Sequence, residues 1–278
     1  MIREQAFDLG PAIQGAPRAL TLAWQDLIQG LKAFPIWGML GWQDIRQRYR
    51  RSVLGPFWLT ISTAIMVGAL SIVYSGLFNQ SLSEYLPFIG TGLIIWTLIS
   101  TIFNESCHVF TSAEGMIKQI RLPLTLHVCR MVWRNVIIFG HNAVILLLIY
   151  MFFGKGWHVD LLSLPLALLV LAINGVTVGL ILGVFCTRFR DIVQIVANMI
   201  QLLFFVTPIM WNPEALADRG WIAHFNPAYH FIELMRAPIL GAAFPVVSWQ
   251  VATSITALGI VLALLMLTRF RHRVAYWL

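Results

Sequence analysis

Four arginines crowd into the stretch RQRYRRSVLGPFW, residues 46–58, and make it the most positively charged segment of the chain. They are Arg46, Arg48, Arg50 and Arg51. Guanidinium groups bind phosphate through paired N–H donors, and basic clusters beside a membrane bind anionic lipid head groups. The cluster therefore favours a site for the phosphate of a lipid. A second interpretation stays open, because basic flanks also anchor membrane helices on one side.

A stripe of uncharged polar residues occupies the segment 192–211. Gln194, Asn198, Gln201 and Phe205 follow one another at spacings of 4, 3 and 4 residues, which places them on one face of a helix. Amide groups are costly against lipid and should face protein or water. Because an ion pathway would need charged residues, the stripe predicts a lining for an uncharged, hydroxyl-rich substrate such as a sugar chain. Helix–helix packing is the alternative, since polar side chains also join membrane helices.

A weaker polar face runs along the segment 57–78. Thr60, Ser71 and Tyr74 share one side of a helix there, with small residues between them. This face admits the same two interpretations, a channel lining or a packing surface.

The elements that must position these residues are membrane helices. The chain has 278 residues, of which 59% are hydrophobic and only 11% charged, whereas a soluble domain has roughly 25% charged residues. Six runs without charge are each at least 20 residues long, enough for a helix to cross a ~30 Å hydrocarbon core at ~1.5 Å per residue. The predicted fold is an all-α integral membrane protein with six transmembrane helices, at 57–78, 86–106, 132–153, 162–186, 192–211 and 247–268.

Lysines and arginines indicate the orientation of these spans. With six spans both termini share one side, which holds 16 of the 19 lysines and arginines, while Lys155, Arg219 and Arg236 fall on the other. Both termini are therefore predicted to be cytoplasmic. The net charge of +7 mainly reflects this asymmetry and gives no reason to expect a nucleic-acid partner. The chain divides into a cytoplasmic N-terminal segment 1–34, an amphipathic interface helix 35–55 and a single transmembrane domain 56–278.

Three predicted segments are not spans. The interface helix mixes aromatic residues with the arginines and should lie on the cytoplasmic leaflet until Gly55 and Pro56 break it. The cytoplasmic loop 107–131 contains a short helix at about 112–121. The outer segment 212–246 is amphipathic, interrupted by proline and too short to cross twice, so it predicts two re-entrant half-helices.

Catalytic motifs are absent from the sequence. It contains no G-x-x-x-x-G-K-[ST], H-E-x-x-H or G-x-S-x-G, and its three cysteines lack ligand spacing, so neither ATP hydrolysis nor a metal or cofactor is expected in this chain. The energy should then come from a partner. A gradient-driven carrier would have to use the intramembrane His141. A membrane-embedded transferase acting on lipid-linked sugars would have to draw its acid or base from Glu105, His108, His230 and Glu233.

Four motifs, taken in order, resemble a known family. RYRRSVLGPFW precedes the first span, SAEGMIKQIRLP lies between the second and third, TPIMWNPE follows the fifth, and FNPAYHFIELMR precedes the sixth. Together they are similar to the permease subunits of bacterial polysaccharide ABC exporters, the type-2 family that moves lipid-linked O-antigen, capsule and teichoic acid chains. The resemblance covers about residues 35–275 and assigns no role to residues 1–34.

The resemblance implies a homodimer in the bacterial inner membrane, two ATP-binding-cassette subunits that bind ATP and Mg on the cytoplasmic face, and an undecaprenyl-linked polysaccharide as substrate. The first and fifth spans would line the glycan channel, and the substrate's pyrophosphate would enter at the arginine cluster. The outer gate would include Trp211, Pro213 and Trp221. A permease for a drug or small lipid is the closest alternative. The coupling helix resting on the ATPase would use Glu114, Met116, Ile117, Lys118, Ile120 and Arg121.

Overall fold

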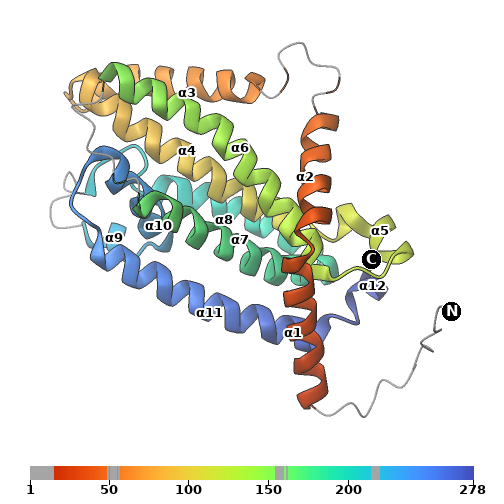
Figure 1. The fold of residues 1–278 in the computed structure, drawn as a ribbon. Coiled ribbons are helices and arrows are strands. Elements are labelled where there is room, and N and C mark those ends of the chain that lie inside the picture. Colours follow the sequence, from red (N-terminus) through yellow and green to blue (C-terminus); the bar gives the residue numbers. More distant parts are fainter. Residues whose placement is uncertain are drawn as a thin grey trace.

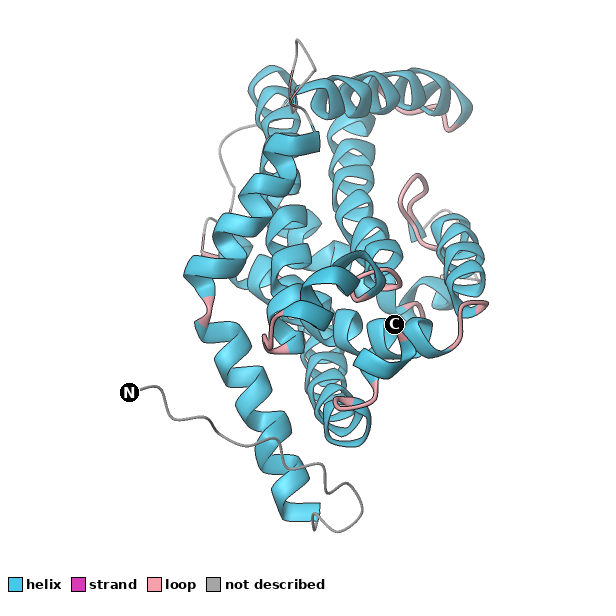
Figure 2. Cartoon of the chain, turned by 90° about the vertical axis from the view of Figure 1, so that its right-hand side faces the viewer, coloured by secondary structure: helices cyan, strands magenta, loops and turns pink. Residues whose placement is uncertain are grey.

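The described part of the chain is built of helices. A computed structural model describes residues 16–48, 50, 55, 57–153, 160, 162–213 and 220–278, and every regular element within these ranges is helical (Figure 1, Figure 2). Among the described residues, five helices are long and apolar enough to cross a membrane. They are α3 (Phe57–Leu77), α4 (Leu82–Ser106), α6 (Leu124–Phe153), α7 (Ser163–Arg188) and α11 (Val246–Phe270).

Eight shorter helical elements complete the part of the fold that the structure describes. They are α1 (Ala16–Lys32), α2 (Phe34–Arg48), the 3-10 turn η1 (Thr111–Ala113), α5 (Glu114–Gln119), α8 (Ile192–Val206), α9 (Trp221–His224), α10 (Pro227–Leu240) and α12 (Val274–Trp277). Asn226 caps α10 by accepting a hydrogen bond from the Ala228 amide, with Pro227 at the first helical position. The helix ends at Gly241, whose φ of 67° is the left-handed conformation that glycine adopts without strain.

The fifth predicted span is shorter in the structure than the sequence indicates. A helix was predicted over 192–211, but α8 ends at Val206 after 15 residues, a length of about 22 Å at ~1.5 Å per residue against the ~30 Å needed. Pro208 explains the early end, because proline disfavours the helical conformation of the residue before it. Thr207 is accordingly extended, with ψ of 135°.

Helix α4 is the centre of the bundle. It packs against α3, α6, α7, α8 and α10, so its residues 89–96 are buried on every side. Two glycines allow close approach of neighbouring helices there. A Cβ at Gly90 would lie 3.0 Å from Ile149 of α6 and 3.4 Å from Val67 of α3. A Cβ at Gly92 would collide with the guanidinium of Arg236 in α10.

Helices α1 and α2 lie across one end of the bundle, at a steep angle to the long helices (Figure 1, Figure 2). The interface helix predicted over 35–55 is thus present as α2, which covers Phe34–Arg48, while residues 49 and 51–54 lie outside the described residues. Helix α1 lies within the segment 1–34 that the sequence left without structure. The C-terminal helix α12 and the short α5 contact each other at this same end.

Helix α1 is tied to the start of α6. The Asp26 carboxylate is buried and accepts hydrogen bonds from the amides of Leu124 and Thr125, both at 3.1 Å, and from the Thr125 hydroxyl at 2.9 Å. A carboxylate at a helix N-terminus satisfies free amides and interacts favourably with the helix dipole. Arg271, which follows α11, donates to the Leu22 carbonyl at 3.1 Å. Residues 16–32 are therefore an integral part of the bundle.

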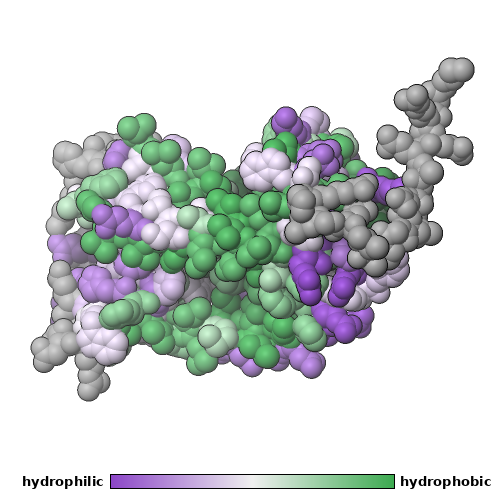
Figure 3. Space-filling model, turned by 90° about the horizontal axis from the view of Figure 1, so that it is seen from below, coloured by the Kyte–Doolittle hydropathy of each residue, from purple (hydrophilic) through white to green (hydrophobic). Residues whose placement is uncertain are grey.

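The outer surface has the polarity of a membrane protein. Figure 3 shows a broad hydrophobic band across the middle of one face, with hydrophilic residues gathered towards both ends. Large apolar side chains on α3, α6 and α11 are exposed along this length, among them Ile65, Leu147 and Leu258. Because such side chains are costly in water and favourable in lipid, the chain is a multi-pass membrane protein.

Candidate functional site

The arginine cluster divides between two faces of α2. Arg46 and Arg50 are exposed and line an open groove of about 910 Å³ together with Trp42 and Gly55. Gly55 has a φ of 56°, so the turn at this point requires the left-handed conformation. Arg48 points the other way, because two residues along a helix correspond to a rotation of about 200°. Its Nη2 lies 3.7 Å from a Glu105 carboxylate oxygen of α4.

The fourth arginine of the predicted cluster, Arg51, lies outside the described residues. The structure therefore brings Arg46 and Arg50 to one groove and assigns Arg48 to a different environment.

A network of charges on the inner face of α2 joins that helix to α4 and α6. Asp44 accepts hydrogen bonds from Arg130 Nε at 2.8 Å and Arg134 Nη1 at 2.9 Å. Arg134 also pairs with Glu105, donating from Nη2 to Oε2 at 2.7 Å. Asn135 donates to the same Glu105 oxygen at 2.6 Å. Burial alone would raise the pKa of the Asp44 carboxyl, but the hydrogen bonds and charges of the two arginines hold it below its ordinary value.

The predicted polar face of α3 is mostly a packing face. Ser71 is fully buried and its hydroxyl donates to the Val67 carbonyl at 2.6 Å. Thr60 is only 9% exposed, and Tyr74 is half-buried with its ring stacked on Phe78. Thr60 and Ser71 are thus buried on the side of α3 that packs on α4 and α6, and the residues on the opposite face of α3 are apolar and exposed. That Thr60 and Ser71 line a channel stays a prediction.

The stripe on α8 has the opposite orientation. Gln194, Asn198, Gln201 and Phe205 are all exposed, and Phe205 keeps 63% of its surface accessible. Gln194 donates to Asn198 on the same helix, Nε2 to Oδ1 at 3.1 Å. The polar face of α8 therefore points away from the rest of the chain, and it does not join α8 to the helices of its own bundle.

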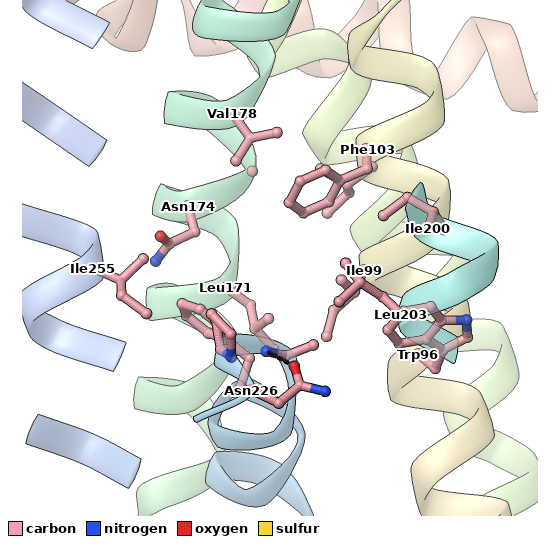
Figure 4. A pocket seen from close by; sticks show the side chains of 15 residues that line it. Trp96, Ile99, Phe103, Leu171, Asn174, Val178, Ile200, Leu203, Asn226 and Ile255 are labelled. Atoms are coloured by element: carbon pink, nitrogen blue, oxygen red, sulfur yellow. Dashed lines mark hydrogen bonds between the residues drawn. The ribbon is translucent and has the colours of Figure 1, made fainter. Parts of the chain in front are cut away.

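The inner face of α8 borders a cavity. Ile200 and Leu203 line a space of about 270 Å³ whose other walls belong to α4, α7, α10 and α11 (Figure 4). The lining is almost entirely apolar, with Asn174 and Asn226 as its amide side chains. Asn174 is engaged with Thr256 of α11, Nδ2 to Oγ1 at 2.6 Å. Because protein interiors are otherwise close-packed, α8 is held less tightly on this side than a core helix is.

The irregular segment after α8 is held by side chains from two other helices. Arg236 of α10 donates from Nη1 to the Pro208 carbonyl at 2.9 Å, and its Nη2 lies 3.5 Å from the Ile209 carbonyl. Tyr85 of α4 donates to the Met210 carbonyl. Asn226 donates to the Thr207 hydroxyl at 2.8 Å. Carbonyls freed by the early helix end are therefore satisfied inside protein, as non-helical backbone at membrane depth requires.

Arg236 is the centre of this arrangement and was missed from the sequence. It is 2% exposed, pairs with Glu233 at 3.2 Å, and lies over the Phe88 ring with 4.3 Å from Cζ to the ring centroid. The sequence does contain a signal for this pair, because Arg236 lies one turn after Glu233 in a helical segment that has proline near both ends. We name Arg236, Tyr85 and Asn226 the outer clamp.

The predicted gate residues surround the same region. Trp211 is half-buried and its Nε1 donates to the Phe205 carbonyl at 3.4 Å. Pro213 is half-buried. Trp221, in α9, is 59% exposed and meets Phe225 edge to face. Re-entrant geometry stays a prediction; α9 has four residues and α10 fourteen.

The predicted coupling helix is present as η1 and α5. Glu114 and Lys118 form an ion pair at 2.6 Å on its exposed side, and this hydrogen bond lowers the pKa of the Glu114 carboxyl. Ile120 and Arg121 are exposed, and Met116 is half-buried. Ile117 instead packs against the chain's own core beside α6 and α7. That Ile117 inserts into a partner stays a prediction.

With this architecture in view, comparison with known proteins identifies the class. The sequence model of the ABC-2 type transporter family matches residues 37–240, from α2 to the end of α10, and the chain belongs to that family. The family resemblance drawn from the sequence is thereby confirmed.

Curated relatives point to a particular kind of transporter. The chain is 24% identical over 190 residues to the O-antigen export system permease protein RfbA of Myxococcus xanthus, covering 66% of this chain and 72% of the relative. It is 21% identical over 187 residues to the protein of the same name from Klebsiella pneumoniae, with the same coverage.

Proposed function

We propose that this chain is the membrane subunit of an ATP-driven exporter that moves a lipid-linked polysaccharide across the bacterial inner membrane. The leading candidate for this polysaccharide is an O-antigen. Membership of the ABC-2 family and the names of the two relatives support this proposal. Two copies would form the passage, and two separate ATP-binding-cassette subunits would bind ATP and Mg. Capsular polysaccharide is the neighbouring possibility within the same class.

The observation that carries the proposal is the outward direction of the α8 stripe. Three amide side chains exposed along an otherwise apolar helix are costly against lipid. A second copy of the chain facing this surface would enclose a polar passage flanked by Phe205. Amides offer both donors and acceptors to sugar hydroxyls, so the passage suits an uncharged glycan better than an ion.

The orientation of the exporter follows from the distribution of charge. The end that holds α1, α2, α5 and α12 also carries most lysines and arginines, so we assign it to the cytoplasm. The course of the chain then makes α8, together with the segment after it, the fifth of six membrane crossings. Both termini would lie in the cytoplasm. Arg46 and Arg50 would bind the diphosphate of the lipid carrier in their groove as the substrate enters.

Coupling to ATP would begin at α5. Closure of the ATPase dimer would displace α5 and the ends of α4 and α6 that flank it, and these helices would move nearly as rigid bodies. The cavity behind α8 leaves that helix room to shift towards α7, which would widen the passage. The outer clamp would keep the far end of α8 in place during this movement.

A triple variant tests the α8 stripe. We expect Gln194→Leu, Asn198→Leu and Gln201→Leu together to abolish display of the glycan at the cell surface, while the protein still inserts and dimerises. The matched control replaces Thr253 and Ser254 by Leu; both are exposed, on α11, and bond only to their own helix. Undiminished glycan display in the triple variant would refute a role for the stripe in the passage.

A second experiment tests the energy source. We expect the purified chain to hydrolyse no ATP alone and to retain an ATP-binding-cassette subunit when it is isolated from its native membrane under mild conditions. Export in vesicles reconstituted with this chain as the sole protein would contradict the proposal.

The alternatives fit the side chains less well. Three of the four groups that a transferase would need are engaged: Glu105 with Arg134, Glu233 with Arg236, and His230 with Ser248 at 3.0 Å. The fourth, His108, is exposed in the turn before η1, apart from His230 and Glu233 of α10. His141, the candidate relay of a gradient-driven carrier, lies 2.9 Å from the Ile137 carbonyl of its own helix. Export of a drug or small lipid would use the same fold, and a transport assay with each substrate class separates it from glycan export.

A further inference from the structure

Helix α1 has an apolar side that the rest of the described chain leaves open. Leu20 is 52% exposed, Trp24 51% and Leu31 47%. At 3.6 residues per turn, these three side chains and the half-buried Ile28 lie within an arc of about 80°. We call these four residues the apolar row. Exposed apolar side chains are ordinary when they are single, but a contiguous row of them marks an interaction surface.

The other two sides of α1 differ from the apolar row and from each other. The side that packs on the bundle carries the buried residues Ala23, Asp26 and Gly30. The side next to the apolar row is polar and exposed, again within an arc of about 80°. It carries Thr21, Gln25, Gln29 and Lys32. A helix with three such sides is suited to three environments at once, which are protein, lipid and water.

The contacts of α1 place it at the level where membrane spans end. Asp26 accepts hydrogen bonds from the first amides of α6, at Leu124 and Thr125. The Leu22 carbonyl accepts one from Arg271, directly after the end of α11. Figures 1 and 2 show α1 lying across this end of the bundle, along one edge and at a steep angle to the long helices. A helix with this level and direction lies along the surface of the bilayer.

We propose that α1 is a membrane-surface helix whose apolar row enters the adjacent leaflet while its polar side faces water. Helix α2 supports this assignment, because it follows α1 along the same edge and also exposes apolar side chains, among them Phe34 and Met39. Trp24 in the middle of the row fits the same position, since tryptophan is enriched where membrane and water meet.

The charge of α1 indicates which force would hold it in the leaflet. Among the side chains of α1 that the structure describes, Lys32 is the one exposed charge, and Asp26 is buried. Attraction to anionic lipid is therefore weak, and insertion would depend on the area of the apolar row. We favour lipid over a protein partner as the occupant, because lipid surrounds the bundle at the level of the span ends in any case.

Insertion of α1 would have a mechanical effect on its neighbours. Asp26 ties the helix to the start of α6, and α6 begins at Leu124, shortly after α5 ends at Gln119. A helix seated in the leaflet would thus hold the start of α6 at a fixed depth beside a moving α5. The assignment of the apolar row itself depends neither on the cargo nor on the energy source.

Spin labels on the full chain in phosphatidylcholine nanodiscs test the proposal. Leu20→Cys and Leu31→Cys place a label on the apolar row, and Gln25→Cys and Gln29→Cys are matched controls on the polar side. The three native cysteines are buried, so labelling should be confined to the introduced one. We expect labels on the row to be relaxed several-fold more by oxygen, which concentrates in lipid, than by a water-soluble nickel complex. The controls should show the reverse.

Other outcomes of this experiment would overturn the proposal. Stronger relaxation by the nickel complex at positions 20 and 31 would place the row in water. If an added ATP-binding-cassette subunit then covered it, the row would be a protein surface instead. An equal response at all four positions would show that α1 does not lie along the bilayer surface. Adding phosphatidylglycerol should change nothing, and insertion that requires this lipid would contradict a mechanism based on apolar area.

A pair of charge variants gives an independent measurement by hydrogen exchange in the same nanodiscs. Leu20→Glu with Trp24→Glu places two charges on the apolar row, and Gln25→Glu with Gln29→Glu places two on the polar side. All four positions are exposed, so the bundle should fold in both variants. Amides of α1 should exchange about tenfold faster or more in the first variant, because charge is costly in lipid. The second variant should match the wild type, and equal exchange in the two would refute insertion.

Discussion

Replacing Arg236 with methionine is the sharpest test of the outer clamp. The change keeps an unbranched, apolar side chain of useful volume but removes the guanidinium. The Pro208 and Ile209 carbonyls then lose their donor, Glu233 loses its ion pair, and Phe88 loses its cation. Pro208 and Ile209 are buried in the described chain, and Glu233 and Phe88 are half-buried.

The expected magnitude follows from burial. Removing one partner of a buried ion pair costs about 3–5 kcal/mol, because the remaining charge is left uncompensated. At ~2–4 °C per kcal/mol for a chain of this size, melting should fall by roughly 6–20 °C. The double change Arg236→Met with Glu233→Leu should recover a large part of this loss, since no lone charge then stays buried.

Two measurements check this reasoning. Thermal melting of the solubilised protein gives the stability, and hydrogen exchange gives local opening, which should accelerate at residues 207–210 before it does elsewhere. Arg269→Met is the control, because Arg269 is exposed at the end of α11, and surface changes are usually within about 0.5 kcal/mol. Melting within about 2 °C of the wild type, or a double variant less stable than Arg236→Met, would refute the clamp.

Two further predictions concern the end of the bundle that holds α1 and α2. Asp26→Ala should weaken docking of α1 by about 1–2 kcal/mol, the usual cost of losing a helix cap, and should speed proteolysis within α1, whereas Gln25→Ala at the exposed neighbouring position should not. Arg46→Glu combined with Arg50→Glu should strongly reduce glycan export without loss of insertion. If Arg269→Glu lowers export equally, the groove arginines act only as a topology anchor.

The membrane helices were predictable because charge is so costly in lipid. Charge-free runs located each long helix, and errors fell at the ends: α6 begins at Leu124, eight residues before the predicted start. Those first turns carry Arg130, which the sequence assigns to the loop 107–131, and Arg134, which lies at the start of the predicted span. Their pairing with Asp44 and Glu105 removes the penalty, and such pairing between distant segments has no local signal.

Orientation of the polar faces was predictable only in part. A helical stripe shows which residues share a face but not what that face meets. Ser71 and Gln201 therefore received the same interpretation, yet one is buried against α4 and the other is exposed. The break after α8 had a visible signal in Pro208, but the helix length could not be derived without knowing that Arg236 accommodates the freed carbonyls.

The attachment of α1 has a consequence for how the protein is made. Its anchoring hydrogen bonds connect Asp26 to residues 98 and 99 positions later and Leu22 to a residue 249 positions later. At a translation rate of ~5–20 residues per second, roughly 10–50 s pass between the synthesis of this segment and the synthesis of its last contact residue. A ribosome that stops early thus releases a chain with a loose N-terminal helix, which gives proteases a means to distinguish unfinished molecules from complete ones.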